Sequence, residues 1–391
     1  MARAPVYLDY HATTPVDRRV LETMLPFFCD DFGNAASSTH PWGWKARAAV
    51  EAARREVAEL IGATPREIVF TSGATESNNL AIRGIAGRTS PDRRHLVVSA
   101  IEHKSVLEVA HALGREGWRV SVVPVGRDGL IDLHALEMVA AKAAMISVIA
   151  ANNEIGVIQP LEAIGAIARA AGALLHVDAA QAAGKIPVNV ASTPIDLLSL
   201  TAHKMYGPKG CGALFIRRKL DLQPMIVGGG HEHGLRAGTL NVPSIVGLGA
   251  ACALCRAEMA AEGPRLAALR DRLLAGLRAA GGVSVNGSLE HRLPHNLHVS
   301  FVDVDGESLL IAIGDIAVSS GSACSSASGQ PSHVLTAILG TDPVPSAAVR
   351  FGLGRFTTDA EVDYAIEKFT AVVGHLRAQE FSNPSRVSPG A

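Results

Sequence analysis

The sequence lacks a dominant charge of either sign. Its 36 lysine and arginine residues nearly balance 37 aspartate and glutamate residues, so the formal net charge at pH 7 is −1 and the isoelectric point is near 7.0. A strongly basic surface, which would bind nucleic acid or an anionic membrane, is therefore not indicated. We expect the partner to be a small molecule or another protein, with no nucleic acid and no membrane.

Cysteine and long apolar runs are also scarce. Five cysteines among 391 residues are too few and odd in number for a disulfide framework, so we expect reduced thiols. No apolar run reaches the roughly 18 residues of a membrane span, and the first residues lack the apolar segment of a signal peptide. These absences favour a cytoplasmic protein.

Apolar residues are present in sufficient number for more than one core. Hydrophobic residues make up 48% of the chain and charged residues 19%. A chain of 391 residues exceeds the size at which a single core stops growing, so we expect two domains. We place the large domain at residues 13–255, the small domain at 256–380 together with an N-terminal arm at 1–12, and a disordered tail at 381–391.

Short β-rich runs alternate with helical patterns through the first half of the chain. Such alternation predicts an α/β fold with a mostly parallel, mixed seven-stranded sheet flanked by helices. Ligands bind such sheets outside the carboxyl ends of the strands. The predicted strands are residues 68–70, 96–99, 120–125, 145–150, 174–177, 197–200 and 213–216.

The pattern changes after residue 255. A helix is predicted over 266–277, and β-rich runs follow at 297–302 and 317–319. A last helix begins with a capping box formed by Thr358 and Glu361. These elements predict a smaller α/β domain.

Polar residues follow five of the predicted strands. Residues 71–75 form a glycine-containing turn before a helix, where backbone amides can bind a phosphate, and His103, Asn153, Asp178 and Lys204 follow four other strands. Taken singly, each is more often structural, and a lone lysine is usually a surface residue. Together they supply a phosphate site, a carboxylate for a protonated ring nitrogen, and a desolvated amine that can attack an aldehyde. Pyridoxal phosphate requires this combination.

Eight motifs carry a resemblance to a known family. They occur in the family's order over nearly the whole chain and are jointly specific. On these motifs the sequence resembles the cysteine desulfurases of the NifS/IscS type, in the class V branch of the fold-type I pyridoxal-phosphate enzymes. The motifs are residues 7–14, 70–77, 152–156, 176–181, 202–210, 236–240, 319–325 and 350–355.

The resemblance implies a role for each matched residue at the cofactor, pyridoxal 5'-phosphate. Lys204 would be the Schiff-base lysine, Asp178 would pair with the ring nitrogen, and His103 would stack on the ring. Asn153 and Gln181 would contact the ring substituents. The implied cofactor-binding residues are Ala74, Thr75, His103, Asn153, Asp178, Gln181, Thr201, His203, Lys204 and Thr239.

The resemblance also implies a homodimer and a substrate site. Thr239 would reach the phosphate bound by the neighbouring subunit. Asn34, Asn153 and Arg350 would bind the substrate, and Arg350 would hold the substrate carboxylate by a two-pronged ion pair.

Cys324 lies in a stretch of small and polar residues, 319–330, that contains no large apolar side chain. Nothing in this stretch would anchor it in a core, so we expect it to be mobile. By the resemblance, Cys324 would take the sulfur of L-cysteine as a persulfide and carry it to an acceptor. The implied catalytic residues are Lys204, Cys324 and His103.

The implied activity is that of a cysteine desulfurase, which forms L-alanine from L-cysteine and passes sulfur to acceptor proteins. The acceptors would serve iron–sulfur cluster assembly, or the sulfuration of other thio-cofactors or tRNA. No metal site is predicted, although Cys324 could transiently ligate an iron–sulfur cluster. A selenocysteine lyase or a class V aminotransferase would keep the cofactor residues without needing a mobile thiol. A sulfur-carrying or scaffold protein would have lost the cofactor site.

Three positions depart from the family pattern. His11 stands where serine or asparagine is common, His233 stands where arginine is usual, and Asn34 is not followed by the expected proline. Cys252 and Cys255 lie in an alanine-rich helical run without a second cysteine pair, so we interpret them as core residues and not as metal ligands.

Overall fold

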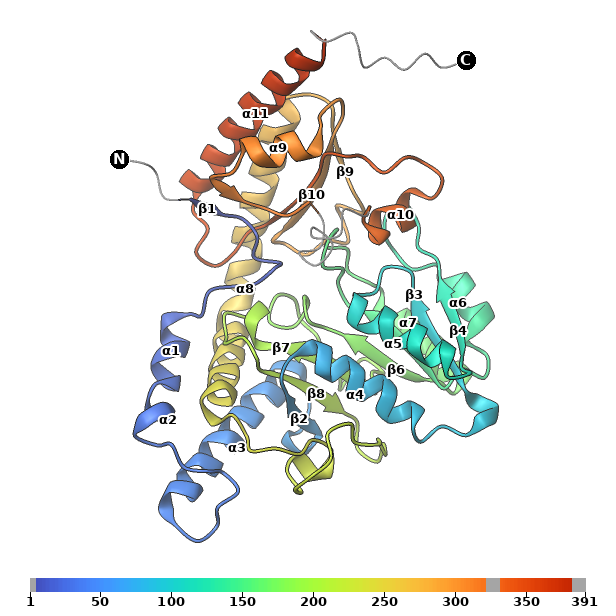
Figure 1. Ribbon diagram of the computed structural model, residues 1–391, viewed down its shortest axis with the longest axis vertical. Helices are drawn as coiled ribbons and strands as arrows, with labels where there is room; N and C mark the ends of the chain where they lie inside the picture. Colours follow the sequence, from blue (N-terminus) through green and yellow to red (C-terminus); the bar gives the residue numbers. More distant parts are fainter. Residues whose placement is uncertain (1–4, 321–330, 382–391) are drawn as a thin grey trace.

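The computed structural model describes residues 5–320 and 331–381 (Figure 1). Seven strands form one sheet in the larger body: β2 (Ile68–Thr71), β3 (His95–Ser99), β4 (Arg119–Val123), β5 (Met145–Ile149), β6 (Leu174–Asp178), β7 (Leu197–Thr201) and β8 (Gly212–Ile216). Their order is β2-β8-β7-β6-β5-β3-β4. Strand β8 is antiparallel to both neighbours, and all other neighbours are parallel. The predicted mixed sheet and its seven strands are confirmed.

Helices cover both faces of this sheet. Apolar residues of α3 (Pro41–Ile61), α6 (Leu133–Ala140) and α7 (Leu161–Ala171) pack on one face. Residues of α4 (Ala74–Ala86) and α5 (Lys104–Arg115) pack on the other. Successive strand residues point to opposite faces, so Met145 and Ile146 of β5 belong to different cores. Burial on both faces explains why the strands other than the edge strand β4 are nearly continuous apolar runs.

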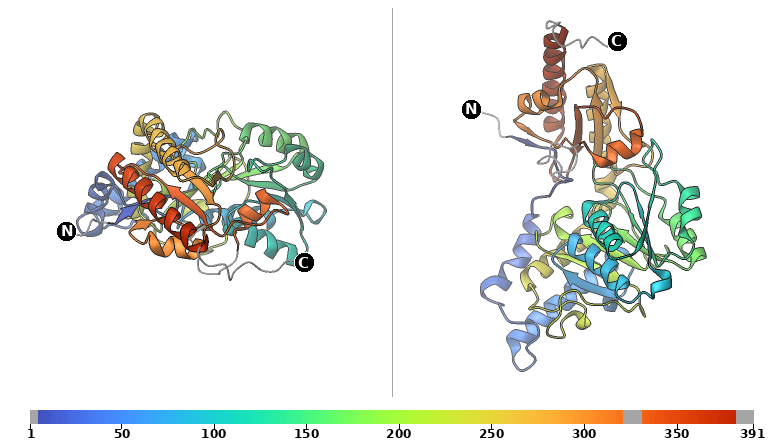
Figure 2. Two further views of the ribbon diagram at one scale, coloured as in Figure 1. Left: turned by 90° about the horizontal axis from the view of Figure 1, so that it is seen from above. Right: turned by 45° about the vertical axis from the view of Figure 1, so that its right-hand side comes forward.

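The smaller body contains a three-stranded antiparallel sheet of order β12-β10-β9. Its strands are β9 (Val283–Val285), β10 (Asn296–Phe301) and β12 (Ala348–Gly352), and its helices are α9 (Gly306–Ala312), α10 (His333–Leu339) and α11 (Asp359–Phe381). Figure 2 shows α11 lying beside the sheet along the outside of this body. The predicted capping box is present, because Thr358 N–H donates to Glu361 Oε2 at 2.8 Å.

Helix α8 (Val242–Ala279) connects the two bodies without interruption. Its first half buries Leu248 and Cys252 in the core of the large body, and its second half buries Leu266 and Leu273 in the core of the small body. The domain boundary proposed at 255/256 therefore lies inside a helix. By length and composition α8 could also cross a membrane, but a buried core helix of a soluble protein meets the same criterion.

The N-terminal segment also crosses between the two bodies. Strand β1 (Val6–Tyr7) pairs in parallel with β11 (Ile316–Ala317) in the small body. The chain then reaches the large body, where the N–H of Thr14 donates to His203 O at 2.9 Å. The remaining short elements are α1 (Arg18–Met24), α2 (Pro26–Cys29) and the 3-10 turns η1 (Pro65–Glu67), η2 (Pro91–Arg93), η3 (Ala202–Lys204) and η4 (Glu232–Gly234).

Candidate active site

A cavity of about 470 Å3 lies at the carboxyl ends of the parallel strands of the large sheet. Its volume is within the range of pockets that bind small molecules. Polar residues from five strand ends and from the small body line it together. Those predicted from the sequence are Ala74, Thr75, His103, Asn153, Asp178, Gln181, Thr201, His203, Lys204 and Arg350.

Two predicted residues lie outside the cavity. Asn34 is exposed, and its Oδ1 accepts the N–H of Ala36 at 2.9 Å. Thr239 is also exposed and does not line the cavity. Cys324 lies outside the described residues. His233, which departs from the family pattern, is exposed, has a left-handed backbone (φ 58°) and does not line the cavity.

The turn before α4 forms one end of the cavity. Gly73 has φ 147°, a conformation that residues with a side chain disfavour. It is the N-cap of α4, and the first backbone amides of this helix have no intrahelical acceptor. The hydroxyls of Thr75 and Thr201 and the imidazole of His203 line the same cavity. Burial, with the charges of Lys204 and Lys209, lowers the pKa of His203 to about 4, so the ring is neutral. This end offers N–H and O–H donors suited to a phosphate.

Asp178 ends β6 and is 2% exposed. Its Oδ2 accepts Asn78 Nδ2 at 2.8 Å, and its Oδ1 accepts the N–H of Ala180 at 3.0 Å. Both donors fix the orientation of the carboxyl group. Asn78 lies in α4 and was not predicted as a site residue.

His103 caps the start of α5. Its Nδ1 accepts the N–H of Ser105 at 3.1 Å and lies 2.8 Å from Ser105 Oγ. Because a backbone N–H can only donate, Nδ1 is unprotonated and the neutral ring carries its hydrogen on Nε2. Burial lowers the pKa of His103, against the opposing charge of Asp178, so the neutral ring is favoured. Asn78 Nδ2 also donates to Ser105 Oγ at 2.8 Å, which connects His103 to Asp178.

Lys204 extends from η3, directly after β7, toward the N-terminal segment. Its Nζ donates to the carbonyl oxygen of Ala12 at 2.8 Å and also to that of His11. Thr14 holds the flanking backbone, because its Oγ1 donates to His203 O at 3.0 Å and accepts the N–H of Tyr206 at 2.9 Å. Thr14 thus fixes the backbone on both sides of Lys204 and, with it, the position of the amine.

Arg350 enters the cavity from β12. Its Nη1 donates to Asn153 O at 2.9 Å, and its Nη2 donates to Asp9 Oδ1 at 2.8 Å and to Ser319 Oγ at 3.1 Å. Arg350 is 1% exposed. Within the described residues, its Nε has no hydrogen-bond acceptor. A substrate carboxylate would share this arginine with Asp9.

His11 is a buried structural partner of the site. Its Nε2 accepts Asn296 Nδ2 at 3.1 Å, so the neutral ring carries hydrogen on Nδ1 and donates to Gln181 Oε1 at 3.0 Å. Its ring stacks on His295 with 4.5 Å between centroids. Burial, together with the charge of Arg350, lowers the pKa of His11 well below its usual value. His11, which stands where serine or asparagine is common, therefore orients Gln181. The sequence alone does not reveal this contact.

Glu102 is a fully buried carboxyl beside His103. Its Oε1 accepts the hydroxyl of Ser99 and the N–H of Ile149 at 2.8 Å, while Oε2 has no partner in the described part of the chain. Burial raises the pKa of Glu102 to about 8. The group is therefore protonated at neutral pH.

No cluster of three metal-ligating side chains occurs within residues 5–320 and 331–381. Cys252 and Cys255 are buried in the core of the large body. Burial raises the pKa of both thiols, which favours unreactive packing residues.

Comparisons with known proteins agree on one family. Residues 6–365 match the family described as aminotransferase class-V. A cysteine desulfurase IscS of Anaeromyxobacter sp. (strain Fw109-5) is 55% identical over 379 residues, which cover 96% of this chain and 94% of the relative. A solved NifS-like protein has a TM-score of 0.89 at 38% identity, covering 95% of this chain and 100% of that chain. A structure of SspA in complex with cysteine has a TM-score of 0.79 at 37% identity, covering 90% of this chain and 100% of that chain.

Proposed function

Because this chain belongs to the aminotransferase class-V family and is a cysteine desulfurase of the IscS type, we propose that it converts L-cysteine to L-alanine with pyridoxal 5'-phosphate and transfers the sulfur through Cys324. The observation that carries this proposal is the meeting of three groups in one cavity. They are the Lys204 amine, the Asp178 carboxylate and the anion-binding start of α4.

The donor and acceptor groups of the cavity fit the cofactor. A buried carboxylate held by two N–H donors suits a protonated ring nitrogen, and helix amides with hydroxyls suit a phosphate. When bound, the cofactor supplies an electron sink for negative charge that develops at the substrate Cα. The residues that would hold it are Ala74, Thr75, His103, Asn153, Asp178, Gln181, Thr201, His203 and Lys204.

The chain's own residues would orient the substrate and move its protons. Arg350 would bind the substrate carboxylate in place of part of its contact with Asp9, aided by Asn153. Lys204 would remove the Cα proton, and the Nε2–H of neutral His103 would donate to the substrate sulfur. Asn34 lies outside this cavity, so its proposed substrate contact would require a neighbouring subunit or a movement of its loop.

Cys324 would complete the transfer. Its thiolate would form a bond to the substrate sulfur while the Cβ–S bond breaks, and the bonding electrons would stay with carbon, which is protonated to give alanine. The resulting persulfide would pass its outer sulfur to an acceptor protein. Such acceptors would include an iron–sulfur scaffold, and we place the enzyme in the cytoplasm as a homodimer in which Thr239 contacts the neighbouring subunit's phosphate.

Two measurements on the purified holoenzyme test this function. Borohydride reduction followed by peptide mapping should fix the cofactor at Lys204. After exposure to L-cysteine, mass spectrometry should find added sulfur on the Cys324 peptide, and Cys324→Ser should abolish it, whereas Cys29→Ser, at an exposed cysteine, should not. Cofactor fixed at another residue would refute the assignment. Undiminished sulfide release by Cys324→Ser would favour a selenocysteine lyase or an aminotransferase.

A further inference from the structure

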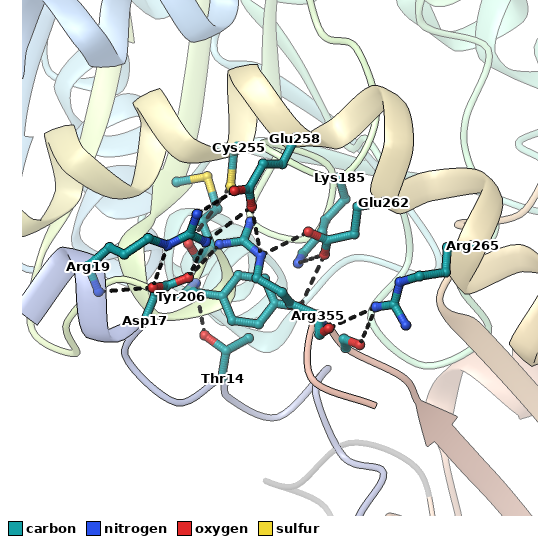
Figure 3. Close-up of polar contacts among 12 residues, drawn as sticks. Thr14, Asp17, Arg19, Lys185, Tyr206, Cys255, Glu258, Glu262, Arg265 and Arg355 are labelled. Atoms are coloured by element: carbon teal, nitrogen blue, oxygen red, sulfur yellow. Dashed lines mark hydrogen bonds and ion pairs between the residues drawn. The ribbon is translucent and has the colours of Figure 1, made fainter. Parts of the chain in front are cut away.

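A largely buried group of charged side chains surrounds Tyr206, two residues after Lys204 (Figure 3). We call it the Tyr206 cluster and define it as Tyr206, Lys185, Arg355, Glu262 and Asp17. None of these five residues lines the cavity. The cluster joins the N-terminal segment, α8 and the segment after β12, so it lies where the two bodies meet.

Two cations lie against the ring of Tyr206, which is 0% exposed. Lys185 Nζ is 4.0 Å from the ring centroid, and the guanidinium carbon of Arg355 is 4.4 Å from it. Cation–π contacts are strongest where water is excluded, as it is here. The ring is therefore held electrostatically as well as by packing.

The hydroxyl of Tyr206 is held as well. It accepts the backbone N–H of Arg355 at 2.6 Å and donates to Glu262 Oε1 at 3.3 Å. Glu262 Oε2 in turn pairs with Arg355 Nε at 2.9 Å, and its Oε1 lies 3.8 Å from Lys185 Nζ. Burial raises the pKa of the Tyr206 hydroxyl, which keeps this donor protonated.

The backbone of Tyr206 adopts an unfavourable conformation. Its φ is 62°, in the left-handed region that bulky residues rarely enter. Such a conformation persists only where surrounding contacts determine it. Here the N–H of Tyr206 donates to Thr14 Oγ1 at 2.9 Å, and its carbonyl accepts the N–H of Asp17 at 2.9 Å. These contacts fix the turn in which Lys204 stands.

Arg355 connects this turn to the substrate side of the cavity. It follows Arg350 by five residues in the chain, and its Nη1 pairs with Asp17 Oδ2 at 2.9 Å. We propose that Tyr206 is a positioning residue, which through Lys185, Arg355 and Glu262 fixes the Lys204 turn relative to the strand that carries Arg350. The inference rests on the proposed function, because it requires that Lys204 bind the cofactor.

Three variants separate the contacts of Tyr206. Tyr206→Phe removes the hydroxyl but keeps the ring, Tyr206→Leu removes both, and Lys185→Met removes one cation. Tyr364→Leu is the matched control, since this part-buried tyrosine of α11 donates its hydroxyl to Asp315 and neither residue lines the cavity. The readouts are visible circular dichroism of the holoenzyme, which reports cofactor orientation, kcat and KM for L-cysteine, and Tm.

We expect Tyr206→Leu to change the visible circular dichroism and to lower kcat by about tenfold to 100-fold, because small misplacements of a reacting group cost this much. Tyr206→Phe and Lys185→Met should each lower kcat by roughly threefold, and Lys185→Met should add little in the Tyr206→Leu background, as expected for coupled residues. The control should lower Tm without changing the dichroism or kcat.

The proposal is wrong if the variants at Tyr206 and Lys185 lower Tm as the control does but keep the dichroism and kcat of the wild type. If Tyr206→Leu does not fold, Tyr206→Phe and Lys185→Met decide by the same readouts. A wild-type protein without cofactor at Lys204 would instead refute the proposed function, so the two failures are distinguishable.

Discussion

At the residue scale, Asn78 links two groups that the proposed chemistry needs. Its amide donates both to Asp178 Oδ2 and to Ser105 Oγ, which contacts His103. Asn78→Ala should lower kcat by about tenfold to 100-fold, because a hydrogen bond to a charged group contributes roughly 1.5–3 kcal/mol. Steady-state kinetics with L-cysteine would measure this.

The neighbouring asparagine provides a matched control for this prediction. Asn79 donates to Thr75 O of the same helix at 2.9 Å and, among the described residues, to no charged group. Asn79→Ala should therefore keep kcat within about twofold, as for helix substitutions that remove no charged contact. Equal losses in the two variants would show that the helix, and not the contact to Asp178, is responsible.

The raised pKa of Glu102 predicts that the stability of the protein depends on pH. Its pKa is raised from the ordinary 4.5 to about 8, so the folded protein keeps a proton that the unfolded chain releases in this interval. The free energy of unfolding should therefore fall as the pH rises from about 4.5 to about 8. Glu102→Gln mimics the protonated acid and cannot ionise, so its Tm relative to the wild type should rise between about pH 5.5 and pH 8.5.

Thermal unfolding at these two pH values tests the prediction. The exposed Glu137 gives the control, because Glu137→Gln removes a solvated carboxylate and should leave the difference from wild type unchanged. A Glu102→Gln variant whose Tm differs from the wild type by the same amount at both pH values would show that Glu102 is ionised in the folded protein.

The site could be predicted from the sequence only where local patterns mark it. Asp178 and Lys204 each follow an apolar run, so their place at a strand end is visible in the chain. Asn78 and His11 are marked by nothing local, since their partners Asp178 and Gln181 lie 100 and 170 positions away. Their roles depend on tertiary contacts.

At the element scale, the close packing of α3 against α8 depends on Gly249. A Cβ at this position would lie 2.6 Å from Ala53 Cα, and backbone cannot move away cheaply. Gly249→Ala should therefore destabilise the protein by about 1–3 kcal/mol. The opposite is expected for Gly374→Ala in α11, where nothing lies within 4 Å and alanine should stabilise the helix by about 1 kcal/mol.

Urea denaturation of both glycine variants would compare the two effects directly. The substitution is chemically identical, so a difference in sign isolates the interhelical contact from helix propensity. If Gly249→Ala were also stabilising, α3 and α8 would have to lie farther apart than described.

The elements themselves were predictable to different degrees. The seven strands of the large sheet are predictable because short β-rich runs alternate with helical patterns along the chain. Strand β12 is not predicted from the sequence, since the charged Arg350 at its centre interrupts the apolar run. Helix α8 was not predicted as one helix, because Pro264 lies inside it and proline usually marks a helix boundary. In both cases tertiary packing overrides the local signal.

At the scale of the whole molecule, the site depends on contacts between the two bodies. Arg350 comes from the small body and bonds to Asn153 O in the large one, while the N-terminal segment contacts Lys204 and pairs with β11. A change in the relation of the two bodies would therefore move the substrate-binding arginine relative to the amine. The site could depend in the same way on contacts between two subunits, because Thr239 is exposed and does not line the cavity of its own subunit.

A heterodimer of two variants, one inactive and one weakened, tests whether Thr239 acts across a dimer. Near it in the chain, Arg236 pairs with Glu76 at 3.0 Å beside the same subunit's cavity, so an action within one subunit is a real alternative. Lys204→Ala should be inactive, and Thr239→Val should lose about tenfold in activity through a missing phosphate contact. If Thr239 acts in the partner, a purified heterodimer of the two variants has one intact site and should show about half of the wild-type activity, because the symmetry gives two equal sites. If Thr239 acts within its own subunit, both sites of the heterodimer are defective. One site lacks Lys204 and the other keeps about a tenth of its activity, so the heterodimer should show about one twentieth of the wild-type activity.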